Sequence, residues 1–103
     1  MNLNKYLPLT ETTYYILLAL LEEGHGYAIM QKVELLSEGK VRIAAGTMYG
    51  AIENLLKQEL IYAIPTSDTR RKVYHITAEG KTVLNLEIER LSHLIAISNK
   101  YKI

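Results

Sequence analysis

The chain has 103 residues, enough for one small domain with a buried core. Apolar residues make up 49% and charged residues 22%, which excludes an intrinsically disordered chain, and the absence of cysteine excludes disulfide scaffolds, thiolate metal sites and cysteine nucleophiles. The net charge is only +1, but residues 1–38 carry two lysines against five glutamates, whereas residues 39–81 carry seven basic against four acidic side chains. The basic stretch is therefore the candidate interaction surface.

Neither a secretory leader nor a membrane span is predicted. The first eight residues hold one lysine and no apolar leader segment. The longest apolar run, residues 14–21, is far shorter than the ~20 residues that a membrane helix needs. We therefore expect a cytoplasmic protein that does not associate with membranes.

Three helices are predicted first, over residues 10–23, 26–37 and 45–59. Thr10 can cap the first helix, and apolar residues cover nearly every face of it, which is typical of a helix at the centre of a core. The second helix is expected to stop at Gly39. The inward-facing apolar residues of the third helix are Met48, Ile52, Leu55 and Leu56.

The periodicity changes after the third helix. Residues 60–65 and 72–77 are short and rich in Ile, Val and Tyr, and a polar stretch separates them, which predicts a β-hairpin with a charged tip. Val41 and Ile43 alternate with basic residues and could form a very short strand that pairs with this hairpin.

A long helix is predicted last, over residues 77–100. Three helices, a hairpin and a further helix give the element order of a winged helix–turn–helix. The expected fold class is therefore mainly α with a β-hairpin. Residues 1–77 would form the winged-helix DNA-binding domain, and residues 78–103 a C-terminal dimerisation helix within one structural unit.

The outward face of the third helix is the first candidate for DNA binding. An α-helix fits the major groove, small residues let its backbone approach a phosphate, and its N-terminus offers unpaired N–H groups. The alternative is an ordinary polar surface helix. The candidate contacts on this helix are Thr47, Tyr49, Gly50, Asn54 and Lys57.

The hairpin tip is the second candidate. Arg70, Arg71 and Lys72 are adjacent cations whose mutual repulsion a phosphate backbone would relieve. Alternatively, they form a solvated turn, or they protect an edge strand from aggregation. In a winged helix the third helix and the hairpin lie on the same side, so both could reach one duplex.

The last helix indicates self-association. At about 35 Å it is longer than a core of this size can cover, so part of its apolar face should be exposed in a monomer. Its apolar residues follow a coiled-coil-like spacing. The alternative is that the helix packs only on its own first helix. We favour a homodimer with an interface formed by Leu84, Ile88, Leu91, Leu94 and Ile95.

The remaining candidates concern small molecules. Tyr14, Tyr15 and Leu91 could line an effector pocket, although such stripes are also typical of a core. The three histidines lie far apart in sequence, so neither a metal nor a cofactor is expected. No nucleophile motif is present, and an enzyme is not predicted.

Four segments resemble the PadR family of transcriptional regulators, with matching order and spacing over roughly residues 9–95. They are LTETTYYIL from residue 9, HGYAI from residue 25, GTMYGAI from residue 46 and RRKVYHITAEGK from residue 70.

The resemblance implies a winged-helix homodimer that binds a pseudo-palindromic operator, usually as a repressor, and responds to a small-molecule effector. The chain is similar to the short subclass with a single C-terminal helix, in some members of which the ligand lies between the subunits near that helix. Thr47 and Tyr49 match the recognition-helix motif, and Arg70, Arg71 and Lys72 match the wing. Some relatives stack planar drugs on a tryptophan where this chain has leucine. The alternative function is a winged-helix protein-interaction module without DNA binding.

Overall fold

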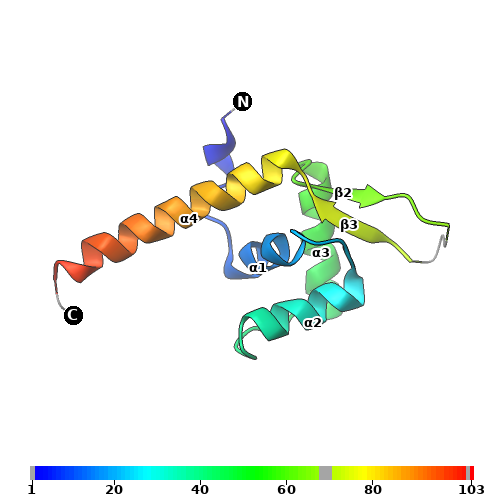
Figure 1. The fold of residues 1–103 in the computed structure, drawn as a ribbon, viewed down its shortest axis with the longest axis horizontal. Coiled ribbons are helices and arrows are strands. Elements are labelled where there is room, and N and C mark those ends of the chain that lie inside the picture. The colour runs from blue at the N-terminus through cyan, green and yellow to red at the C-terminus, as the bar shows by residue number, and fades with distance from the viewer. Residues whose placement is uncertain (1, 68–70, 102) are drawn as a thin grey trace.

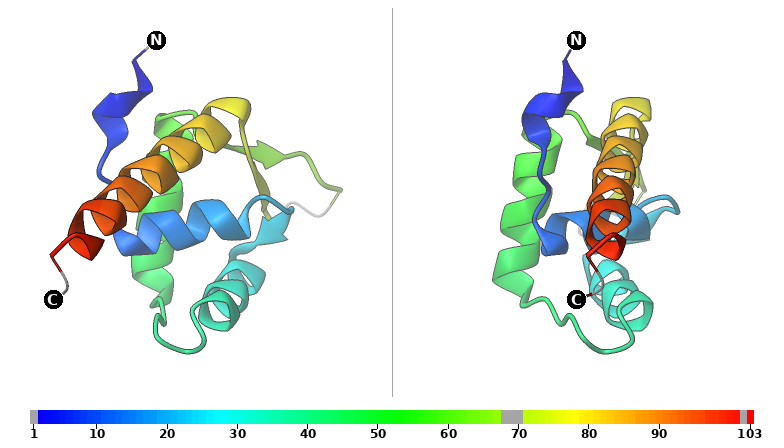
Figure 2. Two further views of the ribbon diagram at one scale, coloured as in Figure 1. Left: turned by 60° about the vertical axis from the view of Figure 1, so that its left-hand side comes forward. Right: turned by 90° about the vertical axis from the view of Figure 1, so that its left-hand side faces the viewer.

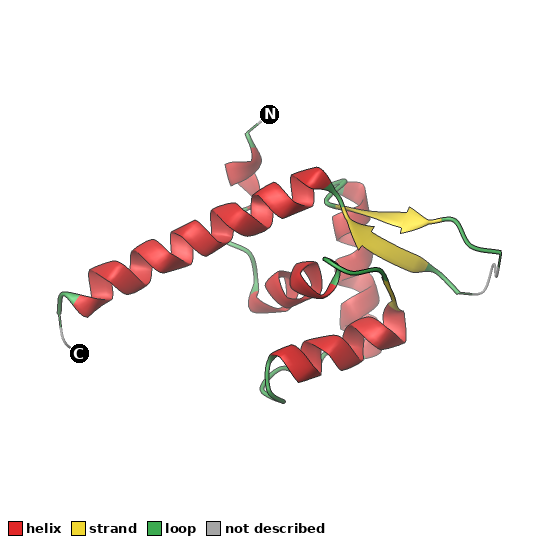
Figure 3. Ribbon diagram, in the orientation of Figure 1, coloured by secondary structure: helices red, strands yellow, loops and turns green. Residues whose placement is uncertain are grey.

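The computed structural model describes residues 2–67, 71–101 and 103. The molecule is elongated, measuring 54 × 35 × 20 Å, because its last helix extends well beyond the body (Figure 1). Figure 3 shows a small sheet at the opposite end, where the hairpin projects from the helical body. The elements are a 3-10 helix η1 (Leu3–Tyr6), α1 (Glu11–Ala19), β1 (Gly24–His25), α2 (Gly26–Leu36), α3 (Ala45–Lys57), β2 (Ile61–Ile64), β3 (Val73–Ile76) and α4 (Ala78–Asn99).

The first helix lies in the core, as its apolar sequence predicts. Ile16, Leu17 and Leu20 are fully buried, and α1 packs against both α2 and α4. Thr10 caps it by accepting a hydrogen bond of 3.1 Å from the Thr13 N–H. The helix ends at Ala19 rather than at residue 23, because the Leu20 carbonyl accepts a bond from the Ile76 N–H of the sheet.

The sheet has three antiparallel strands in the order β1-β3-β2. The hairpin is confirmed, but the prediction of a strand at Val41 and Ile43 is wrong. Gly24–His25 forms the third strand instead, pairing with Tyr74 and Val73. The Val41 N–H and carbonyl are both hydrogen-bonded to the buried Ser37 hydroxyl, at 2.9 and 3.3 Å, so this backbone needs no strand partner.

The second and third helices both end in a left-handed turn formed by glutamate. The backbone φ is 55° at Glu38 and 60° at Glu59. At the end of α3 the Leu60 N–H bonds to the Leu55 carbonyl, and the Glu59 N–H to the Leu56 carbonyl, each at 3.0 Å. This turn satisfies the last carbonyls and ends α3 at Lys57, two residues before the predicted end.

The end of α3 is tied directly to the start of α4. The Thr77 hydroxyl donates to the Glu59 carbonyl at 2.8 Å and caps α4 by accepting from the Gly80 N–H at 3.0 Å. The Thr77 N–H donates to the Leu60 carbonyl. A Cβ at Gly80 would lie 2.1 Å from the Leu60 carbonyl oxygen, so only glycine fits there.

The last helix divides into a buried first half and an exposed second half. Leu84 is only 4% exposed because it packs in the core of its own protomer, so its prediction as an interface residue is wrong. Helix η1 lies against α4 beside the body (Figure 2). Within the described part of the chain, no helix is long and apolar enough to cross a membrane. The exposed apolar residues of the second half are Ile88, Leu94, Ile95 and Ile97.

Candidate nucleic-acid interface

Helix α3 presents a face of small and polar residues to solvent. Met48, Ile52 and Leu55 are buried, as the helical spacing predicts. At Gly46 and Gly50 an added Cβ would meet nothing within 4 Å, so packing within the protomer does not explain either glycine. The exposed residues on this side are Thr47, Tyr49, Gly50, Asn54 and Lys57.

The N-terminus of α3 has no side-chain cap. Its N-cap residue is Ala44, whereas Thr10, His25 and Thr77 cap α1, α2 and α4 with side-chain hydrogen bonds. The first N–H groups of α3 therefore lack a side-chain acceptor, and the helix dipole makes this end attractive to an anion.

Tyr49 connects α3 to the start of α2. An added Cβ at Gly26 would lie 2.5 Å from the Tyr49 hydroxyl oxygen, so the phenol fits only because residue 26 is glycine. The side chain is still 54% exposed. The Tyr49 hydroxyl therefore lies close to the backbone of Gly26, while about half of the residue remains exposed.

A hollow of about 440 Å³ joins the start of α2, helix α3 and the hairpin. Two cationic side chains and three tyrosines converge there. Burial raises the pKa of Tyr74, and the nearby Tyr49 adds to the shift, so the Tyr74 hydroxyl stays protonated. Cations and hydroxyl donors together suit a phosphate group. The lining residues are His25, Gly26, Tyr27, Tyr49, Arg71, Lys72 and Tyr74.

The structure brings some of the predicted site residues together and separates others. Tyr49, Arg71 and Lys72 share the hollow. Lys57 lies at the far end of α3 and forms a long ion pair of 3.9 Å with Glu53. Arg70 lies outside the described residues. The sequence did not predict His25, Tyr27 and Tyr74 as part of this interface, because they are brought to the hollow by the pairing of β1 with β3.

A second cavity, of about 260 Å³, lies between α1 and α4. It brings together all three predicted effector-pocket residues, Tyr14, Tyr15 and Leu91. The two tyrosine rings are nearly perpendicular, with centroids 6.1 Å apart. The other residues that line this cavity are Leu9, Glu11, Glu87 and Arg90.

Glu87 is a buried carboxylate that the sequence reasoning missed. It is 2% exposed, accepts a 2.7 Å hydrogen bond from the Leu9 N–H, and pairs with Arg90. The Arg90 guanidinium and the Leu9 N–H hold its pKa below the ordinary value, although burial opposes them. Its position three residues after Leu84 and four before Leu91 places it on the apolar side of α4, and that spacing could have revealed it.

The histidines do not form a metal site. In the described ranges no group of three potential His, Asp or Glu ligands is close enough to hold an ion. His25 caps α2, the His75 Nδ1 lies 2.9 Å from the Ile76 carbonyl oxygen, and His93 is exposed on α4.

A helical core, an exposed third helix and a hairpin beside it define the winged-helix class of proteins. The protein-family model described as the transcriptional regulator PadR-like family matches residues 16–86. The chain belongs to the PadR-like family, and is therefore a transcriptional regulator rather than an enzyme.

Solved structures agree with this assignment. A transcriptional regulator from Clostridium thermocellum is 27% identical, with a TM-score of 0.77, over 87% of this chain and 88% of that one. A PadR family regulator from Eggerthella lenta is 27% identical, with a TM-score of 0.68, over 86% and 78%.

A more distant structure shares the fold alone. It is the structure of BpsR from Bordetella bronchiseptica, a protein whose DNA binding is regulated by 6-hydroxynicotinic acid. BpsR is 20% identical, with a TM-score of 0.67, over 87% of this chain and 64% of that one. A search of curated proteins gives no match to this sequence.

Proposed function

We propose that the chain is a sequence-specific repressor that binds a pseudo-palindromic operator as a homodimer and is released by a small-molecule effector. The observation that carries the DNA-binding part is the hollow in which Tyr49 of α3 meets Arg71 and Lys72 of the hairpin. Such a regulator acts on chromosomal DNA, and so in the cytoplasm.

The contacts divide into two groups. Thr47, Gly50 and Asn54 lie on the exposed face of α3, where they would approach base edges in the major groove. Tyr49 and the cations of the hairpin and α3 would contact phosphates and set the register of the protein on the duplex. The cations are Lys57, Arg70, Arg71 and Lys72.

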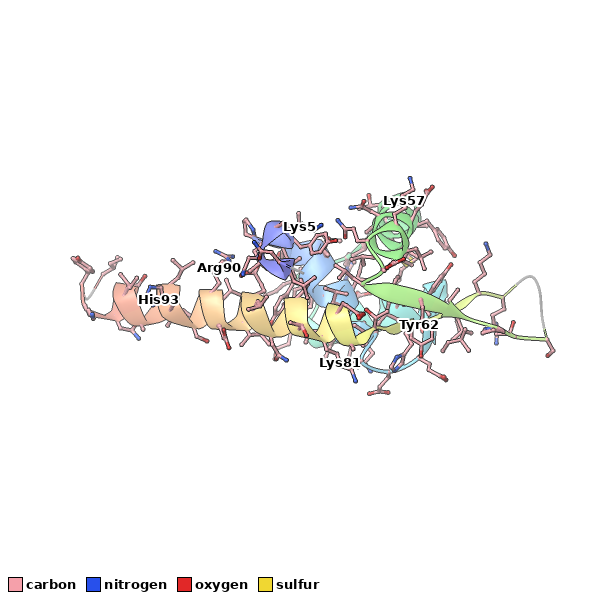
Figure 4. All side chains as sticks on the ribbon, turned by 90° about the horizontal axis from the view of Figure 1, so that it is seen from above. Lys5, Lys57, Tyr62, Lys81, Arg90 and His93 are labelled. Atoms are coloured by element: carbon pink, nitrogen blue, oxygen red, sulfur yellow. The ribbon has the colours of Figure 1, made fainter. Side chains whose placement is uncertain are left out.

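The phosphate contacts are tested by salt dependence. We expect Arg71→Ala with Lys72→Ala to weaken binding to all DNA sequences and to reduce the slope of log K against log salt by about 0.9 for each lost contact. Operator fragments come from selection of bound sequences in random DNA. The matched control is Lys81→Ala with Lys100→Ala, which removes the same charge from α4 and from the residue that follows it. Figure 4 shows Lys81 on the side opposite Lys57.

An unchanged slope in the hairpin variant, or an equal change in the control, would contradict the assignment of the hairpin. If no DNA fragment is retained even at low salt, the DNA-binding proposal fails, and a protein-interaction module becomes the better explanation.

The exposed second half of α4 supports the homodimer. Ile88, Leu94 and Ile95 are 39%, 46% and 61% exposed, a large apolar surface for so small a protein. A two-fold dimer through this face would place two α3 helices about 34 Å apart on one side of a duplex. We expect Ile95→Glu to give a folded monomer in sedimentation, whereas Thr82→Glu, on an exposed position nearer the body, leaves the dimer intact. A wild-type monomer at micromolar concentration would contradict the proposal.

Leu91 links the proposed effector to the proposed dimer. It lines the α1–α4 cavity, and on α4 it lies between Ile88 and Leu94, two residues of the proposed dimer interface. A ligand that contacts Leu91 could favour a dimer geometry with the wrong spacing for the operator, which is the differential affinity that release requires. The regulation of BpsR by a small molecule supports such control in this fold. A compound that raises the melting temperature without releasing the operator would argue against it.

A further inference from the structure

The cavity between α1 and α4 carries an excess of negative charge. Its lining includes two carboxylates, Glu11 and Glu87, against the single guanidinium of Arg90. Because Arg90 pairs with Glu87, its charge is already balanced. Glu11 is exposed and makes no ion pair with any residue that the structure describes. The positive N-terminus of α1 offsets only part of the Glu11 charge.

The walls of the cavity suit a small aromatic cation. Tyr14 and Tyr15 both line the cavity, with their rings nearly perpendicular to each other, and the negative face of an aromatic ring attracts cations. Leu9 and Leu91 add apolar surface. The volume of about 260 Å³ in one protomer is below the usual range for drug-sized ligands, which suits a small molecule such as one ring with a short arm.

An anion of the same size meets two obstacles. Its carboxylate must compete with Glu87 for Arg90, and Glu87 is also held in place by the Leu9 N–H at 2.7 Å. It must also approach the carboxylate of Glu11, and two like charges in a partly buried site repel each other.

We propose that this cavity binds a small organic cation, a protonated amine on a single aromatic ring, in preference to a phenolic acid. The inference rests on the proposed function, because it names the chemical class of the effector. The ammonium lies beside Glu11 and the tyrosine faces, and the ring contacts Leu9 and Leu91.

Three compounds with the same phenol ring and similar arms test the charge preference. They are tyramine, tyrosol and 4-hydroxyphenylacetate, which end in an ammonium, a hydroxyl and a carboxylate. In calorimetric titrations of the wild-type protein we expect tyramine to bind about tenfold more tightly than tyrosol, with 4-hydroxyphenylacetate the weakest. Equal affinities, the reverse order, or no binding of any of the three at millimolar concentration would overturn the proposal.

Two matched variants test whether the carboxylate of Glu11 is the charge that attracts the ammonium group. Glu11 is exposed, so Glu11→Gln leaves the fold intact by circular dichroism, and we expect it to weaken tyramine binding about fivefold without changing tyrosol binding. Glu89→Gln removes the same charge from an exposed position of α4 outside the cavity, and should change neither. If both variants weaken tyramine binding equally, the effect comes from the net charge of the protein rather than from Glu11, and the proposed site is contradicted.

The outcome separates this inference from the proposed function. Operator binding by the ligand-free protein does not depend on the cavity. If the operator is bound but tyramine is not preferred, the inference fails and the DNA-binding proposal stands. If tyramine binds in the expected order but leaves operator binding unchanged, the site stands and its effector role fails.

Discussion

The exposed glycine in the middle of α3 allows stability and DNA binding to be separated by a single methyl group. A Cβ at Gly50 would meet no atom within 4 Å, so Gly50→Ala creates no clash within the protomer. Glycine is about 0.8–1.0 kcal/mol less favourable than alanine inside a helix. We therefore expect Gly50→Ala to raise the free energy of unfolding by about 0.8 kcal/mol and the melting temperature by about 4 °C.

DNA binding should change in the opposite direction. The new methyl group projects from the face of α3 that we propose approaches the duplex, where the backbone of Gly50 now leaves room. A misfit that weakens operator binding about tenfold corresponds to about 1.4 kcal/mol. The variant would then be a more stable protein and a weaker DNA-binding protein.

Urea denaturation at fixed protein concentration measures the first effect, and fluorescence anisotropy on a selected operator measures the second. Thr82→Ala is the control. It removes a hydroxyl that bonds back to the Ala78 carbonyl on α4, so it should stabilise the helix by a few tenths of a kcal/mol without affecting DNA. A Gly50→Ala protein that is more stable and binds the operator as tightly as the wild type would refute the close approach of α3 to the DNA duplex.

Three further predictions concern stability. Gly80→Ala should cost about 3 kcal/mol in urea denaturation, because the new Cβ would lie 2.1 Å from the Leu60 carbonyl oxygen, and an unchanged midpoint would refute this packing. Glu59→Gly should gain about 1 kcal/mol, because φ at this position is 60°, and a loss of stability would contradict the strain. Glu87→Gln should destabilise the protein at neutral pH. Because the folded-state pKa of Glu87 lies below 4.5, the stability it contributes is present above that pH and lost as the pH falls. The difference between the wild type and this variant should therefore narrow in acid, and a constant difference would exclude a role for ionised Glu87.

Local sequence signals predicted the helices and the hairpin because their information is local. The cap at Thr10, the spacing of Met48, Ile52 and Leu55, and the short segments rich in Ile, Val and Tyr after residue 59 each depend on a few neighbouring residues. Helix ends were less accurate, because they depend on partners elsewhere in the chain. Leu20 leaves the helical pattern to bond with Ile76, which lies 56 residues later.

The sites were only partly predictable for the same reason. The exposed face of α3 follows from helical spacing, but the hollow beside it exists only because β1 pairs with β3 and brings His25 next to the hairpin. The hydrogen bond that holds the Glu87 carboxylate is a second example. Nothing near residue 87 shows that the N–H of Leu9 will reach its carboxylate, since the two residues are 78 positions apart.

The junction at Thr77 limits how a regulator with this fold can respond to a signal. Two hydrogen bonds and the tight contact at Gly80 join the end of α3 to the start of α4, so we expect these two helices to turn together within a protomer, as one lever. The angle at which two such levers cross would then set the distance between their tips. A shift of an ångström where the two α4 helices cross would be magnified along the length of each arm, so a small ligand could misalign the pair without unfolding either one.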